Sequence, residues 1–151
     1  RYRLQGTITV ASPVTIQGIG NVRIGSNGTA FQITGTRVTL ENITFEQALP
    51  TETKTVSLEG TYGAVNNCTF AGYQTNAVLV EANNCFVRNC RFTPDVDQGS
   101  ADADIYWGDD AEDGVAVGNM WSTERGYVIS YKSGTDFTQA ANAKAAAIQA
   151  R

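Results

Sequence analysis

One pattern recurs three times in this chain, as Leu40-Glu41-Asn42-Ile43-Thr44-Phe45, Val65-Asn66-Asn67-Cys68-Thr69-Phe70 and Val87-Arg88-Asn89-Cys90-Arg91-Phe92. Each stretch closes a longer segment (31–45, 56–70 and 78–92), and the three segments align without a gap. Every copy begins with two apolar residues two positions apart, followed by a glycine or alanine. Such self-similarity is the signature of a repeat architecture.

The segments begin 25 and 22 residues apart (56 − 31 and 78 − 56). Short alternating bursts such as Val-Thr-Leu and Ile-Thr-Phe, interrupted by glycine and asparagine, indicate strands joined by turns. A period of this length fits one turn of a coil of parallel strands. A leucine-rich repeat would need an L-x-x-L-x-L frame, which is absent, while a β-sandwich remains an alternative. The sequence therefore predicts an all-β fold, a right-handed parallel β-helix of about five turns, over residues 1–132.

Equivalent residues of successive turns should lie directly above one another, about 4.8 Å apart. We expect an amide ladder of Asn42, Asn67, Asn89 and Asn119. We also expect a column of stacked rings, made by Phe45, Phe70 and Phe92. Cys68 should lie over Cys90, and we predict that these cysteines and Cys85 are free thiols, because parallel inward side chains do not point at one another.

Residues 133–151 differ in composition, since alanine dominates and strand-forming residues are rare. Thr135 could cap a helix, and Asp136 favours its first turn. The sequence predicts a short C-terminal α-helix, either a cap on the coil or an oligomerisation element in which Phe137, Ala141 and Ile148 meet.

Composition excludes several kinds of protein. The net charge is −4 and the 11 basic residues are scattered singly, so no basic stripe for nucleic acid exists. No apolar run is long enough for a membrane helix. Histidine is absent, which removes the commonest zinc ligand and the usual catalytic base, and we expect neither a metal nor a cofactor. The chain begins with Arg1 rather than methionine, so we expect it to be a segment of a longer polypeptide.

The sequence resembles the pectate-lyase-like parallel β-helices. The stretch Gly6-Thr7-Ile8-Thr9-Val10 and the following 13–20 look like the first turn of such a fold, and the three hexapeptides resemble its recurring turns. Pectin-degrading enzymes, phage tailspikes and virion adhesins share this architecture, so the resemblance implies a fold more than an activity. The short coil followed by an alanine-rich segment looks most like a phage virion protein, which would imply a parallel homotrimer. No position matches the calcium-binding aspartates and catalytic arginine of the lyases.

The acidic region after Phe92 is the candidate site. Eight of the 15 acidic residues fall between Asp95 and Asp113. Sugars are recognised by carboxylates and by stacked aromatic rings, and glycoside hydrolysis needs two carboxylates. The candidate carbohydrate-binding residues are Tyr106, Trp107, Asp109, Asp110, Glu112 and Asp113, with no assigned catalytic residue.

Each candidate has a structural interpretation as well. The carboxylates could be solvated turn residues. Trp107 aligns with Leu58 and Val80, which favours a core position. The pairs Asp95/Asp97 and Asp102/Asp104 offer oxygen ligands to calcium but lack the pattern of an EF-hand. Glu59 and Glu81 share an offset and could form a like-charge pair, although a solvated column is the simpler interpretation.

Three functions follow as hypotheses. The first is a segment of a phage tailspike or tail fibre, a virion protein located outside the cell that serves as a structural or host-glycan attachment module and contacts other virion proteins. The second is a fragment of a polysaccharide-degrading enzyme, and the third is a capsid decoration protein.

Overall fold

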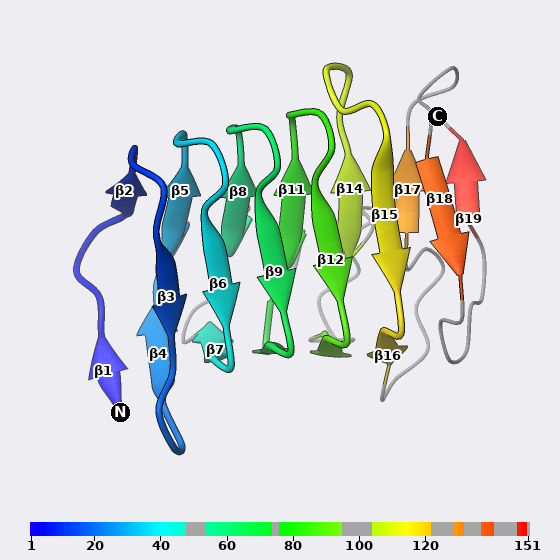
Figure 1. Cartoon of the computed structure of the whole chain (residues 1–151). Coiled ribbons are helices and arrows are strands. Elements are labelled where there is room, and N and C mark those ends of the chain that lie inside the picture. Colours follow the sequence, from blue (N-terminus) through cyan, green and yellow to red (C-terminus); the bar gives the residue numbers. More distant parts are fainter. Residues whose placement is uncertain are drawn as a thin grey trace.

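The computed structural model describes residues 1–47, 54–73, 76–94, 104–121, 129–131, 137–140 and 148–150. Short parallel strands stack there into three sheets, named A, B and C, that form the faces of one coil (Figure 1). Sheet A contains β1 (Tyr2–Arg3), β4 (Arg23–Ser26), β7 (Thr44–Gln47), β10 (Thr69–Ala71), β13 (Arg91–Thr93) and β16 (Met120–Trp121). Sheet B contains β2 (Ile8–Val10), β5 (Phe31–Ile33), β8 (Val56–Leu58), β11 (Val78–Val80), β14 (Ile105–Trp107), β17 (Ile129–Tyr131) and β19 (Ile148–Ala150). Sheet C contains β3 (Thr15–Gln17), β6 (Thr39–Glu41), β9 (Ala64–Asn66), β12 (Phe86–Arg88), β15 (Gly114–Val117) and β18 (Phe137–Ala140).

The chain visits sheets B, C and A in turn, and each such triplet is one coil, from β2–β3–β4 in the first to β14–β15–β16 in the fifth. In Figure 1 the strands of sheet C run downward in front of the upward strands of sheet B, while the chain advances from left to right. This sense of winding is right-handed. The predicted right-handed parallel β-helix is therefore confirmed.

The register follows the repeat found in the sequence. Phe45 pairs with Phe70, and Phe70 with Phe92. The first inward residues of the three segments, Phe31, Val56 and Val78, pair likewise. Because the side-chain period of a strand is two, this register places every repeated apolar residue inside the coil.

An aromatic column runs through the core behind sheet A. The rings of Phe45 and Phe70 are 5.0 Å apart between centroids, and those of Phe70 and Phe92 are 5.3 Å apart, and each pair is stacked with nearly parallel planes. Trp121 continues the column at 5.3 Å from Phe92. The predicted stack is thus confirmed, and it extends one coil further than its phenylalanines.

Asparagines form a second column at the corner between sheets C and A. Asn42, Asn67 and Asn89 all adopt the left-handed conformation (φ 57°, 50° and 54°), which asparagine tolerates better than most residues. The Asn67 Nδ2 donates a hydrogen bond of 2.6 Å to the Asn42 Oδ1, as an amide ladder requires.

The expected place of Asn119 in this ladder is wrong by one residue. Arg88 pairs with Val117, and Arg91 with Met120, so Gly118 (φ 66°) continues the asparagine column and Asn119 lies at the level of Cys90. Asn119 is fully buried, where its Oδ1 accepts a hydrogen bond from the Cys90 N–H and its Nδ2 donates to the Val87 carbonyl. Its side chain therefore satisfies buried backbone groups and does not extend the ladder.

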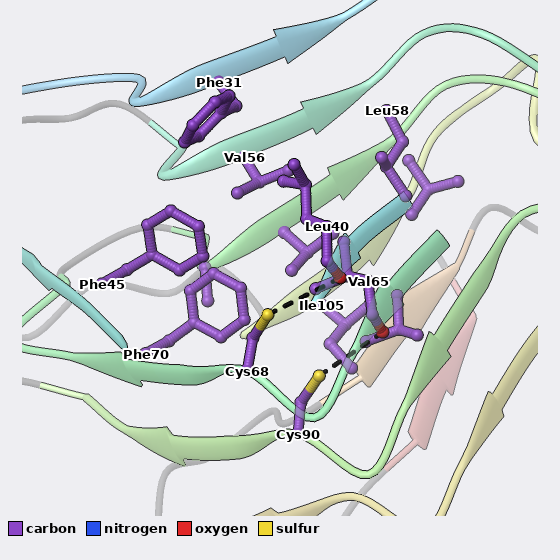
Figure 2. Packing of buried hydrophobic residues seen from close by; sticks show 14 of the residues in the cluster. Phe31, Leu40, Phe45, Val56, Leu58, Val65, Cys68, Phe70, Cys90 and Ile105 are labelled. Carbon is purple, nitrogen blue, oxygen red and sulfur yellow. Dashed lines mark hydrogen bonds between the residues drawn. The ribbon is translucent and has the colours of Figure 1, made fainter. Parts of the chain in front are cut away.

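The three cysteines are buried free thiols, as predicted. The thiols of Cys68 and Cys90 lie one above the other, and each donates to a backbone carbonyl, Leu40 at 3.7 Å and Val65 at 3.5 Å (Figure 2). Burial raises the pKa of Cys68 and of Cys85 to about 11, and it raises the pKa of Cys90 further. The thiols thus behave as small core residues that remain protonated.

The predicted C-terminal helix is not seen. Two of its segments, Phe137–Ala140 and Ile148–Ala150, are strands that pair with β15 and β17, and the intervening residues lie outside the described part of the chain. Alanine has the highest helix propensity, but propensity is a weak determinant of structure, and the open edges of two parallel strands offer backbone partners to any extended segment. Tertiary context therefore overrides local propensity here.

Candidate functional site

The turns between sheets B and C form a corner that carries most of the described acidic residues. Equivalent positions in four successive turns adopt the left-handed conformation: Arg37, Tyr62, Asn84 and Asp113. The turns are bonded to one another through the backbone, since the N–H groups of three residues donate to the next coil: Arg37 to Thr61, Tyr62 to Asn83 and Asn84 to Glu112. These hydrogen bonds of 2.9–3.1 Å hold the side chains of the corner in fixed columns.

We call six carboxylates on these turns the acidic corner: Glu59, Glu81, Asp109, Asp110, Glu112 and Asp113. The last four come from the turn between β14 and β15. That turn is two residues longer than its predecessor, since Trp107 and Val115 are 8 apart where Val80 and Phe86 are 6 apart. All four of its carboxylates are exposed, and Ala111 points inward between them and is fully buried. Asn83 fixes the turn, because its Oδ1 accepts a hydrogen bond of 2.9 Å from the Glu112 N–H.

Glu59 and Glu81 follow the inward residues of consecutive coils, as the repeat predicted. The Glu59 carboxylate accepts hydrogen bonds from Gln32 Nε2, at 3.0 and 3.1 Å, and from Ser57 Oγ, at 2.8 Å. Glu81 is exposed and lies beside Gly108 of the next coil. Glu59 is therefore held in place by its neighbours, and Glu81 is in contact with solvent.

The candidate residues of the sequence analysis separate into three places. Asp109, Asp110, Glu112 and Asp113 lie together on the long turn. Tyr106 lies half-buried on the outer face of sheet B, in register with Leu79. Trp107 is fully buried in the core opposite Val80, as its alignment predicted, so its ring offers no face to a ligand.

Sequence reasoning missed an exposed aromatic residue at this corner. Tyr62 is 48% exposed, and the Arg37 guanidinium lies over its ring, 5.7 Å from the centroid. The repeat could have revealed it, because Tyr62 stands three residues before the inward Val65, as Arg37 does before Leu40. Tyr62 lies on the same corner as the carboxylates, one coil before Glu81 and two coils before the long turn.

The structure gives no support to a metal site. Across the described ranges, no three histidine, cysteine, aspartate or glutamate side chains converge as metal ligands would. Of the two proposed Asp-x-Asp pairs, Asp95, Asp97 and Asp102 lie outside the described residues. Asp104 is fully buried and accepts a hydrogen bond of 2.7 Å from the Tyr73 hydroxyl.

Two hollows mark the surface of the first coils. One, of about 530 Å³, lies between residues 3–7 and 26–29 at the corner between sheets A and B. The other, of about 320 Å³, lies at the asparagine column and is lined by Gly18, Gly20, Asn42, Ile43, Thr44, Asn67 and Thr69.

Comparison with known proteins adds no family. No family model, curated protein or solved structure matches this chain. The stacked parallel strands are compatible with the pectate-lyase-like fold that the recurring turns resemble. The part of the chain with assigned structure contains no helix with the length and apolar character needed to cross a membrane.

Proposed function

We propose that this chain is a segment of a phage virion protein, a tailspike or tail-fibre β-helix, that acts as a structural module and attaches to a bacterial surface glycan. The observation that carries the proposal is the column of outward turn residues at the acidic corner, with Tyr62 exposed between Arg37 and Asn84. The resemblance to pectate-lyase-like β-helices supplies the virion context, the location outside the cell and the assembly as a homotrimer with other virion proteins as neighbours.

The rigidity of the coil supports a structural role. Each turn is bonded to the next along all three sheets, and fully buried side chains fill the interior between them. Interiors packed in this way transmit load with little deformation. A shaft needs that property, and a binding module gains from it because its surface groups are ordered before the ligand arrives.

The chemistry of the acidic corner supports attachment to a glycan. An exposed phenol ring stacks on the apolar face of a sugar, while carboxylate and amide oxygens accept hydrogen bonds from its hydroxyls. Arg37 and Tyr62 hold left-handed conformations that are uncommon for such residues, and strain of this kind gathers at functional sites. A glycan lying along the coil axis would meet a polar group at each successive turn.

Binding to immobilised bacterial surface polysaccharides, measured by biolayer interferometry across a panel, tests the proposal. The Tyr62→Asn variant keeps a residue that tolerates the left-handed conformation and removes the ring, so we expect binding to weaken at least about tenfold. Tyr2→Asn is the matched control, since Tyr2 is 65% exposed but lies on β1 of sheet A. Equal binding by both variants, or no binding to any polysaccharide, would contradict the proposal.

The same samples separate the alternatives. Release of reducing ends from a bound polysaccharide would favour a depolymerase, in which the carboxylates of the acidic corner act as acid and base. Electron microscopy of virions labelled with an antibody to the chain distinguishes a tail protein from a capsid decoration protein.

A further inference from the structure

The corner between sheets C and A changes its form in the first coil. In the next three coils only two residues connect the strands: Asn42-Ile43, Asn67-Cys68 and Asn89-Cys90. In the first coil five residues, 18–22, connect β3 to β4, and their loop projects beyond the other turns of this corner (Figure 1). Ile19, in this loop, is 87% exposed.

The projecting loop and the asparagine column border the shallow, open hollow of about 320 Å³. Gly18 lies at the level of Asn42, close enough that a Cβ atom on it would be 2.2 Å from the Asn42 carbonyl oxygen. Gly20 holds a left-handed conformation (φ 75°) and has open space around it. Both positions thus require glycine or favour it, and the absence of their side chains leaves the hollow open.

The lining of this hollow is polar and carries no charged side chain. It offers the amides of Asn42 and Asn67, the hydroxyls of Thr44 and Thr69, and backbone groups. The amide ladder also ends here, because the first coil has Gly18 where the next coils have asparagine. The ladder bond between Asn67 and Asn42 runs toward the preceding coil, because the Asn67 Nδ2 donates to the Asn42 Oδ1. The next amide in the series would lie in the hollow.

We infer that this hollow binds an N-acetylated hexosamine unit of a surface glycan, whose acetamido group takes the place of the missing ladder amide. The ligand carbonyl accepts from Asn42 Nδ2, and the ring hydroxyls bond to Thr44 and Thr69. The volume suits one sugar unit at the small end of ligand pockets. This inference rests on the proposed attachment to a glycan and adds the class of sugar and a second contact corner.

Titration of ¹⁵N-labelled protein with N-acetylglucosamine and N-acetylgalactosamine, with glucose as the sugar that lacks the acetamide, tests the inference. We expect dissociation constants of the order of millimolar for one or both acetylated sugars, and binding of glucose at least about tenfold weaker. Shifted backbone signals should come from the loop 18–22 and from Asn42.

A matched pair of variants assigns the contact. Asn42→Gly removes the amide and keeps a residue suited to the left-handed conformation, so affinity should fall about tenfold. Asn89→Gly makes the same change in the same column, two coils beyond Asn42, and should leave affinity within about twofold. Equal loss in both variants, or equal binding of glucose, would overturn the role of the acetamide.

The intact polysaccharide distinguishes this inference from the proposed function. Polysaccharide binding that is lost in Tyr62→Asn but unchanged in Asn42→Gly, with no binding of either acetylated sugar, overturns the hollow as a site and retains the attachment function. Absence of binding to sugars and polysaccharides alike overturns both. Binding weakened in Asn42→Gly and not in Asn89→Gly supports both.

Discussion

Replacing Phe70 by alanine tests whether the aromatic column holds the coils together. Phe70 is fully buried, and its ring lies between Phe45 at 5.0 Å and Phe92 at 5.3 Å. Removal of a buried phenylalanine side chain costs about 3–5 kcal/mol, depending on how far the surroundings collapse. The two neighbouring rings belong to strands that are fixed by their own hydrogen bonds, so the surrounding residues can fill the cavity only in part. We therefore expect the free energy of unfolding to fall by roughly 4–5 kcal/mol.

Phe86→Ala is the control for the same change outside the coil. Phe86 is half-buried on the outer face of β12, where the Arg88 guanidinium lies 5.2 Å from the ring centroid. Its replacement removes a cation–π contact and part of an apolar surface, so we expect the free energy of unfolding to fall by about 1 kcal/mol.

Urea denaturation followed by circular dichroism measures both variants. At an unchanged m-value, the midpoint difference gives the change in the free energy of unfolding. For a chain of this length Phe70→Ala should also lower Tm by roughly 8–20 °C, at 2–4 °C per kcal/mol. If Phe70→Ala lowered the free energy of unfolding no more than Phe86→Ala, the idea that the aromatic column holds the coils together would be refuted.

Four further predictions concern buried groups and assembly. Alkylation of unfolded, unreduced protein should find three thiols, Cys68, Cys85 and Cys90, whereas a disulfide would leave one. The pKa of Cys68 and of Cys85 rises from 9.0 to about 11 on folding, so the thiols of the unfolded chain ionise at lower pH than those of the folded chain. The free energy of unfolding should therefore fall between about pH 9 and 11. The fall should be smaller in the Cys68→Ala/Cys85→Ala variant. Tyr73→Phe removes the hydrogen bond to the buried Asp104 carboxylate and should cost about 1.5–3 kcal/mol of unfolding free energy in urea; no loss would contradict the role of this pair. Sedimentation equilibrium at micromolar concentration should find a trimer, and a monomer would refute the proposed assembly.

The core positions of the coil could be predicted from the sequence, because stacking gives equivalent residues of successive coils the same surroundings. Phe45, Phe70 and Phe92 recur since each must fill the same space above its predecessor. The error at Asn119 arose where an inward polar residue replaced the cysteine of earlier coils and Gly118 took the asparagine position. Matching Asn119 to the asparagines of the earlier coils gave the wrong register there. Only the three-dimensional pairing shows that Trp121 replaces the phenylalanine.

The C-terminal segment could not be predicted by the same means. Its alanines carry no inward pattern, so helix propensity was the remaining signal. The strands β18 and β19 form because a neighbouring coil supplies their partners, which no local window of sequence contains. Since Phe137 and Ile148 belong to these strands, an interface between helices has no basis in them, and a trimer would have to use the coils.

Candidate sites lie where a turn departs from the common length, and the geometry of a coil explains why. A stacked strand cannot gain a residue without shifting every inward side chain to the other face. A corner turn can, because the extra residues project outward while the strands on either side keep their register. The loop 18–22 and the turn before Gly114 are both such additions. The first creates a hollow beside the asparagine column, and the second gathers four carboxylates at the opposite edge of sheet C. Variation at these corners can therefore change what the coil binds while its core, and hence its fold, stays the same.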